Sequence, residues 1–408
     1  MRRYFEVLKL PSALLLVTSS LPARIAYGML SLGIYFKIFH ETKSISLAGL
    51  AVGLNALAGS LTAGIRSSVI DKLGLRIPLR FLVPAFATSI VFFNQLHNKI
   101  ALAILAVCFG LFSPPINLSV RPIWKLIAPE EKVRTAFALD TAIMSFAAVI
   151  GPVIVTTLAL SSHPSLALNV CAVLMLVGGI SLALLPITSQ WKPEEKIPNA
   201  IHILKLPAIR LLILEGIFIG IGNGVFEITV PAISTLKHVP HRAGWLFGAF
   251  ATANIIGSLL AGLISKRVTP LKSFKTTYLF WVLIAAPLAF TNPNWSLFAL
   301  GSALGIVVGA QMVFYWELVE IIRPQGSAAS ALGWLWTFEG TAAALGSALG
   351  GYICQTFSPR YGFAFFSICI LIGFTIIKFG SARLQAADRL TSPLEDQEAI
   401  TSSLDKRN

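Results

Sequence analysis

Ionisable side chains occur inside long apolar segments of this sequence, where each of them needs a partner. Arg24, Glu227 and Glu339 lie in such segments, and Asp140 lies in another. A charge near the centre of a bilayer costs about 2.5–3.5 kcal/mol on insertion scales, so such residues are candidates for function. A carboxyl group in this position can take up and release a proton. Glu339, Glu227 and Asp140 are therefore the candidate proton-coupling residues.

Further polar residues follow helical spacing. Arg24, Tyr27 and Ser31 are separated by three and four residues, so they share one face of a helix. Arg24 could bind a substrate anion or tune a nearby carboxylate, or it could clamp neighbouring helices together. Glu227 and Glu339 could couple transport to proton movement, or each could tie its helix to a neighbouring one through an ion pair or a hydrogen bond. The other candidates for a substrate cavity are Asn117, Asn223, Gln311, Tyr315 and Trp336.

The segments that carry these residues indicate an integral membrane protein. Of the 408 residues, 55% are hydrophobic and only 12% are charged, about half the charged fraction of a soluble domain. A helix needs ~20 apolar residues to cross a bilayer core of about 30 Å. Twelve segments meet this requirement: 13–39, 45–66, 77–95, 100–123, 135–160, 165–187, 209–233, 242–266, 272–290, 294–321, 328–355 and 359–381.

The net charge of +14 comes from 32 Lys and Arg against 18 Asp and Glu. These basic residues concentrate in the tails and in every second loop, on the side of the N-terminus. The opposite loops carry only Lys37, Lys43, Lys99, Lys237, Arg242 and Arg360. Because Lys and Arg favour the cytoplasmic side, both termini are expected there, in a multi-pass protein of the cytoplasmic (inner) membrane. The charge is thus a topology signal, and nucleic-acid binding is not expected.

Two halves of six segments each are visible in the sequence. Gly59–Gly64 in the second segment matches Gly257–Gly262 in the eighth at five of six positions. A repeat of this kind is a known transporter plan, with the substrate held near the midplane between the halves. We expect an N-terminal half (1–187), a cytoplasmic linker (188–208), a C-terminal half (209–381) and a disordered cytoplasmic tail (382–408).

The chain resembles the major facilitator superfamily of secondary transporters. The loop after the second segment, Asp71-Lys72-Leu-Gly74-Leu-Arg76, is similar to a signature of that family. Other stretches resemble a bacterial subgroup of permeases: Leu21–Met29, Ala138–Asp140, Gly151-Pro152 and Gly224–Pro231. The resemblance implies an all-α fold of twelve transmembrane helices in two pseudo-symmetric halves, with segments 1, 4, 7 and 10 lining the cavity. It also implies a conformational latch, to which we assign Asp71, Lys72, Gly74, Arg76 and Arg121.

The leading hypothesis is a secondary active transporter that works by alternating access. Proton-coupled export of an amphipathic organic compound is the first expectation. Proton-coupled uptake of a small metabolite, with Arg24 binding its carboxylate, is the alternative, and a transport-inactive receptor is a third possibility from another class. The sequence contains no motif typical of an enzyme, a metal site or a P-loop. We therefore expect no enzymatic activity, no cofactor beyond an ion gradient, and a monomer in the lipid bilayer.

Overall fold

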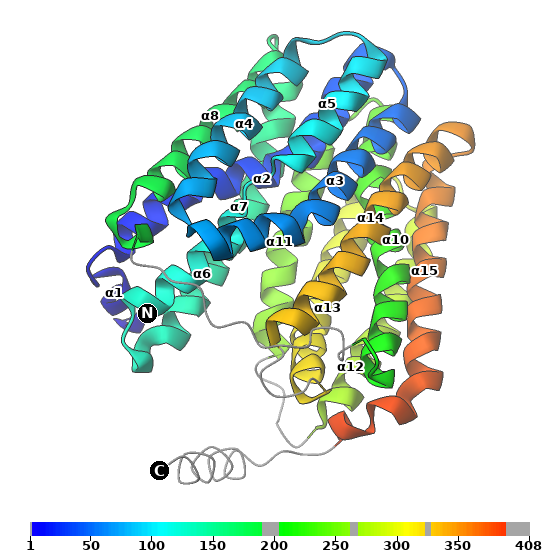
Figure 1. The fold of residues 1–408 in the computed structure, drawn as a ribbon. Coiled ribbons are helices and arrows are strands. Elements are labelled where there is room, and N and C mark those ends of the chain that lie inside the picture. Colours follow the sequence, from blue (N-terminus) through cyan, green and yellow to red (C-terminus); the bar gives the residue numbers. More distant parts are fainter. Residues whose placement is uncertain (1, 190–203, 262–267, 323–327, 389–408) are drawn as a thin grey trace.

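The computed structural model describes residues 2–189, 204–261, 268–322 and 328–388, apart from the side chains of some helical residues (Figure 1). Throughout these ranges every regular element is a helix. The predicted all-α class is therefore confirmed. In Figure 1 the helices of the first half (blue to green) and of the second half (green to red) lie side by side.

Side-chain hydrogen bonds cap the starts of two helices in the first half. The Ser44 side chain accepts a hydrogen bond from the Leu47 amide, and Asn98 accepts from Ile100 and Ala101. Such side chains satisfy amides that have no partner in the first helical turn. The elements are α1 (Arg2–Leu8), α2 (Ala13–Thr42), α3 (Ile45–Leu73), α4 (Arg76–Gln95), α5 (Lys99–Leu111), α6 (Ile116–Ile127), α7 (Glu130–Ala159), α8 (Ser165–Leu184) and η1 (Pro186–Ser189).

The second half follows the same plan. Proline starts three of its helices, at a position where the missing amide hydrogen costs nothing. The elements are α10 (Pro207–Leu236), α11 (Arg242–Ala261), α12 (Pro270–Ala285), η2 (Ala286–Phe290), α13 (Trp295–Ile322), α14 (Ala328–Thr356), α15 (Pro359–Gly380) and η3 (Ser381–Asp388).

Ten helical segments of the described chain are long and apolar enough to cross a membrane. The predicted segment 100–123 is not one helix, because Pro114 and Pro115 separate α5 from α6. Proline lacks an amide hydrogen and clashes with the preceding turn, so it ends α5 early. α14 covers the predicted segment 328–355 but is not among the ten. The count of twelve spans therefore remains a prediction.

Each half has its own apolar core. One cluster of buried residues draws almost entirely on α2–α8, and a second draws on α10–α15. Most of the predicted linker, 190–203, lies outside the described residues. The predicted disorder of the tail is wrong at its start, because Ser381–Asp388 forms η3 and Leu384 is fully buried in the second core. Residues 389–408 lie outside the described part.

The halves touch through small residues of α3 and α14. A Cβ atom on Gly49 would lie 2.8 Å from the Cα of Gly351, so the backbones are in direct contact. The Gln355 side chain also accepts hydrogen bonds from the amides of Ile45 and Ser46, at 2.6 and 3.1 Å. Because α2 runs from the N-terminal end of the bundle towards Ile45, these contacts lie at the opposite end.

A second contact between the halves joins α7 to α11 at the same end. A Cβ atom on Gly244 would lie 2.6 Å from the carbonyl oxygen of Pro152. Glycine permits this close approach, as it does between membrane helices generally.

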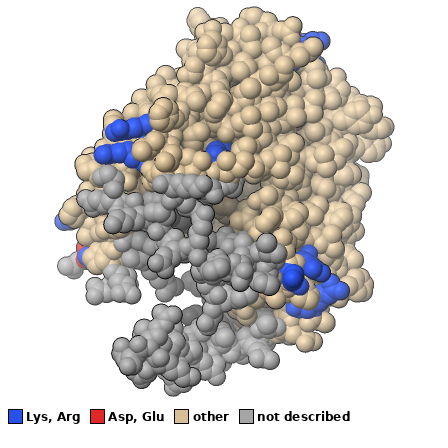
Figure 2. All heavy atoms as spheres, in the orientation of Figure 1, with Lys and Arg blue, Asp and Glu red and all other residues tan. Residues whose placement is uncertain are grey.

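The surface of the bundle is mostly uncharged. Figure 2 shows small groups of Lys and Arg on a face made largely of other residues. Large apolar side chains are exposed on several helices, including Phe81 of α4 (73% exposed), Ile104 of α5 (58%) and Leu259 of α11 (69%). A contiguous surface of this kind is stable in lipid but not in water.

Candidate functional site

An ion pair is buried in the first half. Nη2 of Arg24 on α2 donates to Oδ1 of Asp140 on α7 at 2.7 Å, and the side chains are 2% and 0% exposed. The indole nitrogen of Trp124 on α6 donates to the same oxygen at 3.2 Å. This placement favours a contact with a carboxyl group that joins two helices over a cavity-facing anion ligand. Asp140 is likewise held by two donors.

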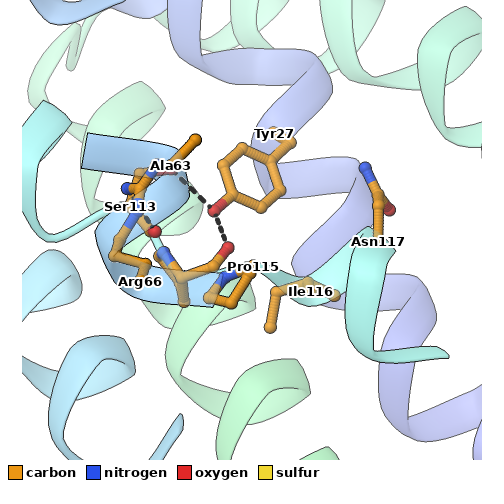
Figure 3. A pocket seen from close by; sticks show the side chains of 8 residues that line it. Tyr27, Ala63, Arg66, Ser113, Pro115, Ile116 and Asn117 are labelled. Atoms are coloured by element: carbon orange, nitrogen blue, oxygen red, sulfur yellow. Dashed lines mark hydrogen bonds between the residues drawn. The ribbon is translucent and has the colours of Figure 1, made fainter. Parts of the chain in front are cut away.

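A pocket of about 180 Å³ lies in the same half, where α2 and α3 meet the break between α5 and α6. Figure 3 shows Tyr27, Arg66, Ser113 and Asn117 around it. The Tyr27 hydroxyl donates to the carbonyl of Pro114 and lies 3.0 Å from the hydroxyl of Ser113. The structure thus brings the predicted cavity residues Tyr27 and Asn117 to one pocket.

Arg66 completes this pocket, and the sequence analysis did not select it. Nη1 donates to the carbonyls of Gly110 and Ser113 at 3.2 and 2.5 Å, and Nη2 donates to that of Gly59 at 2.6 Å. The proline break leaves carbonyl groups without helical partners, and the guanidinium group binds two of them. Three hydrogen bonds fix its position.

The second half holds a pair of carboxyl groups. Glu215 on α10 is 4% exposed and accepts a hydrogen bond from the Tyr278 hydroxyl of α12 at 2.9 Å. Glu339 of α14 lies within electrostatic range of Glu215, and a Cβ atom on the neighbouring Gly216 would lie 3.9 Å from the Cβ of Glu339. Tyr315 of α13 lies within electrostatic range of both carboxyl groups.

Glu215 corrects an expectation from its sequence position. Its place near the start of the seventh segment suggested a residue at the membrane surface. In the structure, α10 begins at Pro207, so Glu215 is more than two turns inside the helix and buried. The sequence does contain a signal: Glu215 directly precedes Gly216, the first of three glycines at steps of four (Gly216, Gly220 and Gly224) that form a small-residue face for close helix packing.

The remaining cavity candidates of α10 and α2 lie near the boundary between the halves. Asn223 is exposed on α10 and lies next to the Glu339 carboxyl group. Glu227, one turn further along, lies next to the Ser31 hydroxyl of α2. Ser31 and Glu227 therefore meet across the two halves, in the half of the bundle that lies away from the start of α2.

The two candidates on α13 are both buried in the second half. Gln311 is 3% exposed and its side-chain oxygen accepts a hydrogen bond from Thr277. Tyr315 is 8% exposed and packs on Phe274 with ring centroids 6.0 Å apart. Trp336 of α14 differs, because it is 53% exposed and its ring touches only Trp316 among the described aromatic contacts, at 6.0 Å. Gln311 and Tyr315 are thus part of the core around the carboxyl pair.

The predicted latch is described in part. Gly74 ends α3 with a φ of 76°, a conformation that glycine adopts without strain. Arg76 donates to the carbonyl of Ala183 in α8 at 3.3 Å, and to the carbonyl of Leu185, directly after α8, at 3.4 Å. The side chains of Asp71, Lys72 and Arg121 lie outside the described residues. The latch therefore remains a prediction.

No group of three or more His, Cys, Asp or Glu in the described ranges is arranged to hold a metal ion.

The sequence model described as Major Facilitator Superfamily matches residues 13–226 and 212–403. No curated protein matches the chain. Several solved structures share the fold. The nucleoside transporter NupG superposes with a TM-score of 0.70 at 15% identity, covering 91% of this chain and 98% of that one.

A bacterial homologue of the iron transporter ferroportin, in an inward-facing state, gives a TM-score of 0.72 at 14% identity, with 90% and 98% coverage. A further structure, of a bacterial metal transporter, gives 0.68 at 15% identity, with the same coverage. At such identities the likeness shows the fold alone. The family match extends over nearly the whole chain, and the chain belongs to the Major Facilitator Superfamily.

Proposed function

We propose that this protein is a secondary active transporter that moves a small organic molecule across the cytoplasmic membrane by alternating access, driven by protons. In this proposal it is a monomer with both termini in the cytoplasm, and it performs no enzymatic reaction. Two pseudo-symmetric halves that meet through small residues are suited to rocking about a central site. With cytoplasmic termini, the contacts of Gly49 with Gly351 and of Gly244 with Pro152 would close the outer side. The state described would then be open to the inside.

The observation that carries the coupling part is the buried pair of Glu215 and Glu339. Two carboxyl groups that are close together and poorly solvated cannot both ionise without strong repulsion, so the pair tends to hold one proton. The hydrogen bond from Tyr278 favours a charge on Glu215, which directs the proton towards Glu339. Glu339 also lies next to Asn223, at the edge of the inter-half space. Rocking of the halves would change the solvent access of Glu339 and allow proton exchange.

Glu227 would act as a second coupling group at the outer gate. Its contact with Ser31 joins the halves only while that side is closed. Protonation would weaken the acceptor and so favour opening. In the same scheme, Asp140 stays paired with Arg24 through the cycle.

Export of an amphipathic compound is the proposed direction of transport. The polar carboxyl pair and the exposed aromatic ring of Trp336 would favour a molecule with both polar and apolar parts. Uptake with Arg24 as the anion ligand loses support, because Arg24 is bonded to Asp140.

The test uses everted vesicles that contain the protein and are energised to an acidic interior. Addition of a lipophilic cation, a neutral amphiphile or an organic anion should relieve the acidification, as reported by an internal pH-sensitive dye, if the compound exchanges for protons. Glu339→Gln should abolish this recovery, and Glu227→Gln should strongly reduce it. Glu320→Gln, on the exposed surface of α13, is the matched control and should leave it intact.

Recovery that persists in both Glu339→Gln and Glu227→Gln would reject the coupling assignment. Ligand binding without any flux, for every compound class and ion gradient, would instead identify a receptor that has kept the transporter fold.

A further inference from the structure

The pocket formed by Tyr27, Arg66, Ser113 and Asn117 contains a positive charge that no side chain neutralises within the described residues. The guanidinium group of Arg66 carries this charge, and it donates to the neutral carbonyl oxygens of Gly59, Gly110 and Ser113. Arg24 of the same half, by contrast, has Asp140 as its counter-ion. Arg66 is partly buried, and a charge that is largely removed from water is normally paired, because leaving it uncompensated is costly.

The fixed position of the guanidinium group suits it to recognition. A salt bridge to a flexible side chain would have to be broken before a ligand could bind, whereas the three carbonyls hold Arg66 without cancelling its charge. Arg66 Nε, a donor, has no hydrogen-bond partner among the described residues, so it is free to donate to an anion. Arg66 lies at the wall of a pocket of about 180 Å³. A small polar group fits into this space (Figure 3).

The start of α6 adds to the positive potential. The helix begins at Ile116, on the pocket wall, and Pro115 provides no side-chain cap. The N-terminus of a helix carries partial positive charge and unpaired amides, which attract an anion. Together with Arg66, it makes the pocket complementary to a negative group and unfavourable for a cation.

The pocket also lies close to the space between the halves. Ala63 lines it, and Ser60, one turn earlier on α3, touches Gly340 of α14. Glu339 immediately precedes Gly340. A ligand whose acidic group occupies the pocket could therefore extend its remaining part towards the carboxyl pair of the second half.

We propose that the Arg66 pocket binds the carboxylate or phosphate group of the transported molecule, which makes that molecule an amphipathic organic acid. This inference rests on the proposed transport function. It assigns to Arg66 the role that the sequence analysis gave to Arg24. The headgroup of an anionic lipid has the same chemistry, and the experiment separates the two sources.

The experiment measures binding by the full-length protein in nanodiscs of phosphatidylcholine. The probes are benzoate and phenyl phosphate, with benzamide as the neutral match for benzoate. Isothermal titration should show binding of the two acids and no binding of benzamide. Arg66→Gln should weaken acid binding by at least about tenfold, the effect expected for a lost hydrogen bond to a charged group. Arg80→Gln, on the exposed surface of α4, is the control and should bind as the unmodified protein does.

Arg66→Gln removes donors from three carbonyls and could fail to fold. Asn117→Asp is the second variant, because it keeps the size of the side chain and all contacts of Arg66 while adding a negative charge to the pocket. It should also weaken acid binding by at least about tenfold, through repulsion and through neutralisation of Arg66. Equal affinity of Asn117→Asp and the unmodified protein for benzoate would overturn the proposal.

The lipid arm repeats the titration in nanodiscs with phosphatidylglycerol. If this anionic lipid stabilises the protein through Arg66 while neither soluble acid binds, the pocket is a lipid site and the proposal is wrong. Binding does not depend on proton coupling, so the two proposals can fail separately. Acid binding without proton-driven flux would reject the coupling, whereas flux of other compounds without acid binding would reject the pocket.

Discussion

The ion pair between Arg24 and Asp140 allows a sharp test of whether it is a clamp or a proton site. In Asp140→Ala, the guanidinium group of Arg24 stays buried without a counter-ion, and the indole N–H of Trp124 loses its acceptor. Arginine stays protonated in proteins, so it cannot escape by becoming neutral. We therefore expect Asp140→Ala to be strongly destabilising.

The magnitude follows from the burial of both partners. Removing one member of a buried ion pair costs roughly 3–5 kcal/mol. Arg24→Met should cost less, because the remaining carboxyl group keeps the bond from Trp124 and can become neutral by binding a proton. In the double variant Arg24→Met with Asp140→Ala, the unpaired charge is gone. The remaining cost is then the orphaned Trp124 donor, about 1–3 kcal/mol.

The double variant should therefore be more stable than Asp140→Ala alone, although it carries one more substitution. Unfolding in mixed detergent micelles, followed by helical circular dichroism, measures the three free energies. A clamp also predicts that the double variant retains proton-driven transport. If the double variant is instead less stable by the sum of the two single losses, the pair makes no net contribution and the interpretation is refuted. If it folds but has lost proton coupling, Asp140 is a proton site.

Three other substitutions test separate contacts. Tyr278→Phe removes the hydroxyl that donates to Glu215 at 2.9 Å. It should reduce the compound-dependent recovery of the dye signal in everted vesicles, while changing the free energy of unfolding by only about 0.5–1.5 kcal/mol. Gly224→Ala should lower the free energy of unfolding by about 1–3 kcal/mol in the same assay, because its Cβ would overlap the backbone of α14. Gly301→Ala is the control: the space around its Cβ is open, so this variant should be neutral or stabilising. Gly53→Leu should prevent the α3–α14 contact from closing, seen as increased labelling of a cysteine placed at that interface; unchanged labelling would contradict the proposed gate.

The fold could be predicted because its main determinants are local in the sequence. Apolar runs long enough to span a bilayer specify helices, and the recurrence of Gly59–Gly64 as Gly257–Gly262 indicates two related halves. The small-residue face at Gly216, Gly220 and Gly224 also predicts close helix packing. In the structure, α10 packs against α14 at these positions: a Cβ on Gly220 would lie 3.0 Å from that of Ala342.

Parts of the site could not be predicted, because helices extend beyond their apolar runs. Arg66 ends the second apolar run, which suggests a membrane-surface residue, yet α3 continues to Leu73 and Arg66 turns inward to the proline break. Glu215 was misplaced for the same reason at the start of α10. A hydropathy pattern indicates the depth of a residue in the membrane only approximately. It does not show which face of a helix packs against neighbouring helices.

Contacts between residues that are far apart in the chain could not be predicted from the sequence either. Arg24 and Asp140 are 116 positions apart, and their spacing carries no sign that they meet. The sequence alone therefore does not decide which role Arg24 has. Once Asp140 is placed against it, the anion-binding role needs another cation, and Arg66 is the cation that the pocket provides.

The two halves balance their buried charges in different ways, and this difference decides where coupling can occur. In the first half, Asp140 is matched by Arg24, a cation that does not titrate, so changing its protonation state would leave a buried positive charge. In the second half, Glu215 has the neutral hydroxyl of Tyr278 as its partner and a second carboxyl group, Glu339, beside it. Adding or removing one proton there changes the charge of the site without orphaning a cation. The proposed division of labour follows: the first half supplies a fixed positive pocket for the substrate, and the second half supplies the variable charge that responds to the proton gradient.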